Sequence, residues 1–149
     1  MIEGWLDINV ESYMKPSCLT LAQIEALLKS VGVNPTAQRL AICRYVLCEA
    51  EHFTVDEVKL WADENFPKMS LATVYNTVNI LVEARLLQTL KLPHTDKLIY
   101  DNNVENHYHF LDEETHQLFD ILPEKIVVKT QLGQGFEIKK TQIFFQGKY

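Results

Sequence analysis

Two helix-period segments joined by a short loop constrain this chain more than any other feature. Residues 54–65 begin with Thr-Val-Asp-Glu, a capping box in which Glu57 can bond back to the amide of Thr54. Residues 70–84 carry apolar side chains at helical spacing. The expected buried stripe of this second helix is Leu71, Val74, Val78, Leu81 and Val82. Because the loop at residues 66–69 is so short, the two helices are expected to form a helix-turn-helix.

The flanking segments extend this pattern into a domain. Residues 19–31 and 36–47 also have apolar residues at helical spacing, and Gly32 and Pro35 separate the two helices that they predict. Residues 86–90 and 97–100 are predicted to be strands around a turn at residues 93–96. Helices followed by a hairpin indicate a winged helix-turn-helix.

After Asp101 the pattern changes to short strands, predicted at residues 107–111 and 117–121. Pro123 is typical of a first helical turn, so a helix is expected over residues 123–132, followed by a turn at residues 133–135. Residues 136–145 are β-rich and out of phase, which a bulge would explain. We therefore expect an α+β protein. Its parts are a winged-helix domain with an N-terminal extension (1–92), a wing end and hinge (93–101), and a small α/β domain (102–149).

The second helix of the helix-turn-helix motif is expected to enter the major groove of DNA. Asparagine can contact adenine through two hydrogen bonds, and threonine methyl groups can contact thymine, so an A·T-rich double-stranded operator is favoured. Lys68 beside the helix N-terminus and Arg39 are candidates for phosphate contacts. The predicted DNA contacts are Arg39, Lys68, Thr73, Tyr75, Asn76 and Thr77. The alternative is a solvated helix face that contacts nothing.

Charge and cysteine content limit the function and the compartment. A net charge of -6 counts against a non-specific nucleic-acid binder, so DNA binding would depend on a few placed cations. Cys18, Cys43 and Cys48 form no Cys-x-x-Cys pair, which argues against a disulfide framework or a thiolate zinc site. No apolar run is long enough for a bilayer, and acidic residues near the N-terminus count against a signal peptide. We expect a cytoplasmic protein with no membrane partner.

A histidine pair at residues 107 and 109 predicts a metal site. In a strand His107 and His109 point to the same face, and Asp101 and Asp120 lie on neighbouring segments. Together with His52 they supply three imidazoles and two carboxylates, a thiolate-free set that suits Fe(II), Mn(II) or Zn(II). Each residue alone is more simply an ordinary surface or strand-end residue. A metallohydrolase is the remote alternative, but no general base is obviously placed for it.

Five motifs together resemble the ferric uptake regulator family, over residues 19–121. They are Pro35-Thr36-Ala37-Gln38-Arg39, Ala50-Glu51-His52-Phe53-Thr54-Val55-Asp56-Glu57, Ser70-Leu71-Ala72-Thr73-Val74-Tyr75-Asn76-Thr77, Asn106-His107-Tyr108-His109 and Leu118-Phe119-Asp120. The resemblance implies a homodimeric transcription regulator rather than an enzyme, with a winged helix, a hinge and an α/β dimerisation domain. It also implies a palindromic operator and puts the regulatory metal ligands on His52, Asp101, His107, His109 and Asp120.

Asp101 indicates the branch of the family. Iron-uptake members usually carry Glu there, whereas Asp is similar to the peroxide-sensing branch and to the haem-responsive iron regulators. In the peroxide branch, bound Fe(II) reacts with peroxide and a ligating histidine is oxidised, which implies oxidation at His52 and His107 here. The alternative is a haem- or iron-responsive regulator, although Cys18 is followed by Leu19 and not by the proline of a Cys-Pro haem motif.

The chain departs from the family at three places. The first cysteine pair of the family's structural zinc site would fall near Asp112 and Thr115, so we expect no structural zinc. Asn106 and Tyr108 replace residues that can bind a second metal in iron-uptake members. Arg85 stands where the family usually has glycine after the recognition helix, so the entry to the wing is expected to differ.

Overall fold

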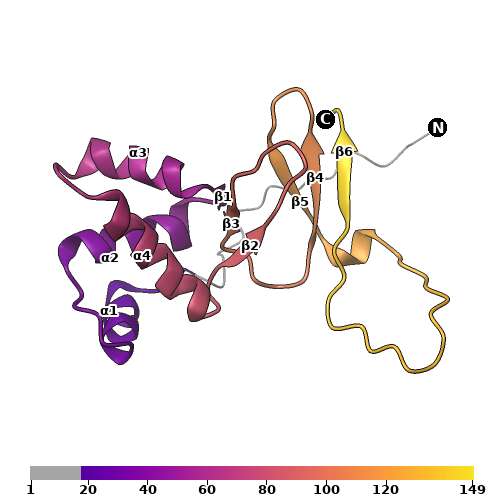
Figure 1. Cartoon of the computed structure of the whole chain (residues 1–149), viewed down its shortest axis with the longest axis horizontal. Coiled ribbons are helices and arrows are strands. Elements are labelled where there is room, and N and C mark those ends of the chain that lie inside the picture. The colour runs from indigo at the N-terminus through magenta and orange to yellow at the C-terminus, as the bar shows by residue number, and fades with distance from the viewer. Residues whose placement is uncertain (1–17) are drawn as a thin grey trace. The chain divides into compact units, whose positions relative to one another are not determined.

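The computed structural model of this protein describes residues 18–149, so most of the predicted lead-in, residues 1–17, lies outside the described part. The chain divides into two compact units, Met1–Val104 and Glu105–Tyr149 (Figure 1). Asn102 belongs to the first unit, because its side-chain amide donates a 3.0 Å hydrogen bond to the carbonyl of Val46.

The described part of the first unit contains four α-helices and a three-stranded antiparallel sheet. The helices are α1 (Leu21–Ser30), α2 (Ala37–Arg44), α3 (Val55–Asn65) and α4 (Leu71–Glu83), and a π-helix, η1 (Tyr45–Glu49), continues α2. The strands β1 (His52–Phe53), β3 (Ile99–Asp101) and β2 (Gln88–Leu90) lie in that order across the sheet. The predicted helices and wing hairpin are confirmed. Strand β1 was not predicted, because two residues are too few to show an alternating pattern.

Hydrogen bonds at the helix N-termini account for where α3 and α4 begin. The Thr54 hydroxyl accepts from the amide of Glu57 at 3.2 Å, and the Glu57 carboxylate accepts from the amide of Thr54 at 2.7 Å. This is the predicted capping box. The Ser70 hydroxyl accepts from the amide of Thr73 at 3.1 Å and fixes the start of α4.

One apolar core holds the first unit together. Its largest fully buried apolar side chains come from α1, α2, η1, α3 and α4: Ile24, Leu28, Ile42, Val46, Leu47, Val58, Val74, Val78 and Leu81. The predicted stripe of α4 is wrong at Leu71, which occupies the first turn of the helix and is 49% exposed. None of the helices in the described part of the chain has the length and apolar character needed to cross a membrane.

The second unit is a three-stranded sheet with β4 (Tyr108–Asp112) at its centre. Strand β5 (Leu118–Ile121) pairs antiparallel on one side, and β6 (Phe144–Gly147) pairs parallel on the other. The predicted helix over 123–132 is wrong: only a 3-10 turn, η2 (Pro123–Lys125), forms, and the segment after it makes the wide loop seen in Figure 1. The β-branched run from Ile126 to Val128 disfavours a helix, and no helical face is buried, since Val127 is 83% exposed.

Strand β6 is also shorter than predicted. The β-rich segment at residues 136–145 becomes a strand only at Phe144, so the expected bulge has no ladder to interrupt.

Polar side chains form the turn between β4 and β5. One Asp112 carboxylate oxygen accepts from the Glu114 amide at 2.9 Å, and the other accepts from the Thr115 hydroxyl at 3.0 Å. The hydrogen bond from the Glu114 amide holds the pKa of Asp112 below its usual value. Polar side chains therefore fix the β4–β5 turn.

The cysteines contradict the expectation drawn from their spacing. Cys18 and Cys48 form a disulfide across 30 residues of sequence, with their Cα atoms 4.6 Å apart. Cys43 is a buried free thiol, and burial raises its pKa to about 12. Sequence spacing indicates Cys-x-x-Cys sites well, but it gives no information on cysteines that only folding brings together.

Arg85 supplies the first prediction, because its φ of 60° lies in the left-handed region just after α4. That conformation costs a non-glycine residue about 1–2 kcal/mol, and the greater entropy loss of glycine on folding cancels part of the gain. Arg85→Gly is therefore expected to raise the free energy of unfolding by up to about 1 kcal/mol, measured by urea denaturation. Arg85→Ala is the control and should show no such gain; a less stable Arg85→Gly variant would contradict the strain argument.

Candidate metal centre and nucleic-acid interface

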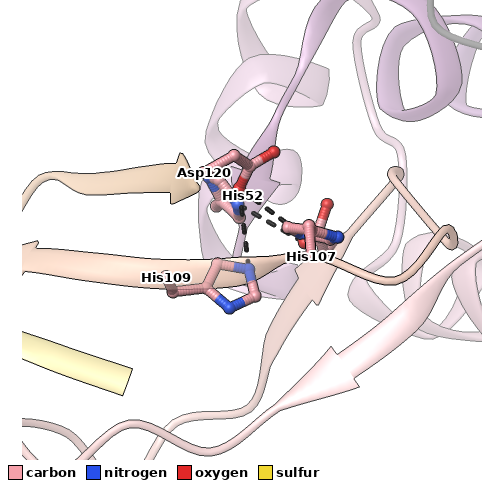
Figure 2. A group of neighbouring side chains, drawn as sticks. His52, His107, His109 and Asp120 are labelled. Carbon is pink, nitrogen blue, oxygen red and sulfur yellow. Dashed lines mark ion pairs between the residues drawn. The ribbon is translucent and has the colours of Figure 1, made fainter. Parts of the chain in front are cut away.

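Three predicted ligands meet on the sheet of the second unit. The β4–β5 pairing places His109 opposite Asp120, and His107 lies just before β4. The Asp120 carboxylate oxygen lies 3.4 Å from Nε2 of His107 and 3.6 Å from Nε2 of His109. The two imidazole rings are 4.5 Å apart between centroids. Figure 2 shows both rings turned toward Asp120, with dashed lines marking these pairs; His52, also drawn there, belongs to the first unit.

Burial and tautomer favour His107 as a ligand. The His107 side chain is 2% exposed and that of His109 is 9% exposed, whereas Asp120 keeps 37% of its surface open. Nδ1 of His107 lies 2.7 Å from the carbonyl oxygen of Glu105. A carbonyl only accepts, so Nδ1 carries the proton, and a neutral ring would then have its lone pair on Nε2, the nitrogen nearer Asp120. Histidine ligands of metals are typically held in this way by a second hydrogen bond.

The distances between these side chains are compatible with a metal site. Direct hydrogen bonds between nitrogen and oxygen are about 2.7–3.2 Å long, and the histidine–aspartate distances here exceed that range. Ligand atoms that bind one ion at about 2.0–2.2 Å lie roughly 3–3.5 Å from one another. His107, His109 and Asp120 therefore have the donor types of a divalent metal site, and their distances of 3.4 and 3.6 Å lie at or just beyond the upper end of the expected spacing. We call these three residues the second half-centre.

The first unit holds the other two predicted ligands in a similar arrangement. Strand pairing sets His52 opposite Asp101, and Nε2 of His52 lies 3.4 Å from a carboxylate oxygen of Asp101. The Asp101 side chain is 1% exposed, and its other oxygen accepts from the Asn103 amide at 2.8 Å. A buried carboxylate requires compensation, which a cation or a protonated imidazole supplies. His52 and Asp101 are the first half-centre.

The sequence reasoning missed two residues that position these ligands. Asn102 is 2% exposed and bonds through its side-chain amide to Val46 and Ala50, which ties the residue after Asp101 to the segment that precedes His52. The Glu105 carbonyl orients His107. Neither had a sequence signal, because a buried asparagine and a backbone carbonyl match no ligand motif.

Helix α4 presents only part of the predicted DNA-contacting set. Tyr75 is 48% exposed and Asn76 is exposed, whereas Thr73 is half-buried and its hydroxyl lies 2.9 Å from that of Ser70. The structure does not favour Thr77 as a DNA contact, because its side chain is fully buried and its hydroxyl donates to the carbonyl of Thr73 at 2.7 Å. Position 77 follows 74 by three residues and precedes 81 by four, so it shares the core-facing stripe.

The two residues predicted to contact phosphate, Lys68 and Arg39, differ in exposure and in hydrogen bonding. Lys68 is exposed in the loop before α4, with a φ of 65°. Arg39 is half-buried on α2, and its guanidinium donates to the carbonyl of Asn34 at 2.8 Å, which leaves its remaining donors for a ligand. Both are cations on the unit that carries α4.

Comparisons with known proteins place this geometry in a family. Residues 30–146 match the ferric uptake regulator family. The chain is 31% identical over 109 residues to the peroxide-responsive repressor PerR of Staphylococcus epidermidis, covering 73% of this chain and 72% of that protein. It is 33% identical over 95 residues to the same repressor of Staphylococcus aureus (strain USA300). That match covers 64% of this chain and 64% of that protein.

A solved structure extends the likeness to the whole fold. The ferric uptake regulator of Helicobacter pylori, described as having three functional metal-binding sites, has a TM-score of 0.65 at 18% identity. The likeness covers 88% of this chain and 93% of that one. At this identity the likeness shows the fold, and it confirms the predicted α+β architecture.

Proposed function

This chain belongs to the ferric uptake regulator family, whose members are metal-responsive transcriptional regulators, and we propose that it is a repressor whose two half-centres close on one divalent ion. The observation that carries the proposal is the spacing of His107, His109 and Asp120, at 3.4–3.6 Å between nitrogen and oxygen. His52 and Asp101 supply a matching pair from the first unit.

The number of ligands in each half-centre supports one shared ion. Fe(II) and Mn(II) usually bind five or six ligands, and neither a pair nor a triad of side chains provides that number. All five together do, and two carboxylates balance the charge of a divalent cation. Asp101 and His107 also flank the junction between the units, which follows Val104. An ion that held both residues would restrict the angle across this junction.

DNA binding then depends on that angle. We propose that a homodimer presents two copies of α4 to a palindromic, A·T-rich double-stranded operator, with Tyr75, Asn76 and Thr73 toward the bases. Lys68 and Arg39 would contact phosphates. Half-sites one helical turn apart, or a multiple of it, require a fixed spacing of the two helices. A typical coupling of about 1–3 kcal/mol between metal and DNA corresponds to about a 5–150-fold change in DNA affinity.

The donor set favours Fe(II) or Mn(II), with Zn(II) also compatible, because all five ligands are nitrogen or oxygen. We propose that the signal is peroxide, which the likeness to peroxide-responsive repressors supports. When bound, Fe(II) would supply the redox chemistry that peroxide requires. The chain's own contribution is to hold His52 and His107 as the groups that become oxidised. An oxidised imidazole no longer offers the same lone pair, so the half-centres separate and the operator is released.

The metal site is tested by His107→Ala. Loss of a buried ligand should lower the affinity for Mn(II) by at least about 100-fold, measured by isothermal titration calorimetry, and should remove the metal dependence of operator binding. His94→Ala, on the exposed wing turn, is the control and should behave like the wild type. Unchanged Mn(II) affinity in His107→Ala would show that the ligands are misassigned.

The recognition helix is tested by a neighbouring pair of substitutions. Asn76→Ala removes an exposed amide and should weaken operator binding by about 1–3 kcal/mol, measured by fluorescence anisotropy with metal present. Thr77→Val removes a buried hydroxyl on the core-facing stripe of α4 and should leave operator affinity unchanged. If Thr77→Val weakens binding and Asn76→Ala does not, the opposite face of α4 reads the DNA.

Peroxide sensing is tested on protein loaded with Fe(II) without oxygen. Brief exposure to hydrogen peroxide should add one oxygen to a peptide that contains His52 or His107, detected by mass spectrometry, and operator binding should fall in parallel. Mn(II)-loaded protein is the control and should remain unmodified. Oxygen added only to methionine or cysteine, with operator binding unchanged, would contradict peroxide as the signal. In a separate titration with haem, a Soret band would favour a haem-responsive regulator.

A further inference from the structure

The disulfide between Cys18 and Cys48 is a reactive group of the first unit that is separate from the proposed metal ligands. Cys18 precedes α1 and is exposed, whereas Cys48 lies in η1 and is half-buried. An exposed disulfide is open to attack by small thiolates, and such bonds are the labile ones in proteins. The pair is therefore accessible from one side, through Cys18.

Hydrogen bonds connect η1, which carries Cys48, to the first half-centre. The Ala50 amide donates to the carbonyl of Tyr45 at 2.9 Å and closes the π-helical turn η1. The buried side-chain amide of Asn102 donates to the carbonyl of Val46 at 3.0 Å and also bonds to that of Ala50. Asn102 follows Asp101, and His52 comes two residues after Ala50. Cys48 and His52 thus lie on one short stretch of backbone, and the Asn102 side chain ties the residue after Asp101 to that stretch.

We propose that Cys18 and Cys48 form a reversible thiol–disulfide site whose reaction partners are low-molecular-weight thiols and their disulfides, and whose closure holds the turn that positions His52. The exchange itself is independent of the metal; its effect on metal affinity rests on the proposed function. The closed bond ties the start of α1 to η1. When it opens, hydrogen bonds such as those of Asn102 still hold the turn, but the covalent restraint is lost.

The exchange balances as two thiol–disulfide steps. In the reducing direction a small thiolate attacks the exposed sulfur of Cys18, forms a mixed disulfide there and expels the Cys48 thiolate, which takes up a proton. A second small thiolate attacks the small-molecule sulfur of the mixed disulfide and expels the Cys18 thiolate. The products are two protein thiols and one small disulfide, so the small thiols supply both electrons. The reverse sequence closes the bond.

Cys43 provides an internal control. Burial raises its pKa to about 12, so at neutral pH it remains a thiol, which is the unreactive form. It is also a buried residue of the core, out of reach of small reagents. Exchange should therefore be confined to Cys18 and Cys48, and replacing Cys43 should not alter it.

The exchange site is tested with glutathione and its disulfide on the full chain. In Cys48→Ser the resolving thiol is missing, so oxidised glutathione should leave one glutathione adduct on Cys18, located by mass spectrometry of peptides. In the wild type the adduct should resolve to the Cys18–Cys48 disulfide, and Cys43→Ala should behave in the same way. No adduct on Cys18 in the Cys48→Ser variant, or glutathione bound mainly to Cys43, would overturn the proposal.

The coupling is tested by titrating Mn(II) into oxidised and reduced wild type and into Cys18→Ser. The oxidised form should bind at least about 5-fold more tightly than the reduced form, and Cys18→Ser, an exposed change that spares the core, should match the reduced form. Equal affinities would overturn the coupling and leave the metal site standing. If no form binds Mn(II), the proposed function fails, while the glutathione experiment still decides whether the exchange site exists.

Discussion

The pairing of β1 with β3 is the contact on which the first half-centre depends. It sets His52 opposite Asp101 and brings a carboxylate that is 1% exposed within 3.4 Å of an imidazole. A carboxylate in such a position is costly unless a cation or donors surround it. Strand β1 is only two residues long, so its pairing is supported from outside the sheet, by the Asn102 side chain and by the Asn102 amide, which lies 3.4 Å from the Glu51 carbonyl.

The two half-centres are built in different ways, and this suits the proposed role. In the second unit, one antiparallel pair of strands fixes His109 and Asp120, and a carbonyl fixes the tautomer of His107. In the first unit the ligands come from segments about fifty residues apart in sequence and depend on tertiary hydrogen bonds. The first half-centre is therefore the one that a change in the surrounding fold, such as opening of the Cys18–Cys48 bond, can alter.

The acidic net charge is consistent with specific rather than non-specific DNA recognition. A chain with a charge of -6 gains little from counterion release along the whole duplex, so its affinity must come from a few cations and from base contacts. In the proposed complex, burial of Thr77 leaves α4 with fewer side chains for base contacts than the sequence indicated. Such a small reading face is more dependent on the correct spacing of two copies, which is what a metal-set angle would provide.

The sequence by itself determined the parts of this protein that local physics controls. Capping residues located α3 and α4, and apolar spacing located the other helices of the first unit. Residue types together with family motifs indicated the five proposed ligands. Tertiary structure decided what depends on distant neighbours: the short strand β1, the disulfide between Cys18 and Cys48, the role of Asn102 and the burial of Thr77. The helix expected after Pro123 does not form, and the reason is again tertiary. A helix gains most of its stability by packing its apolar face on a partner surface, and the sequence of the helix alone does not show whether such a surface exists.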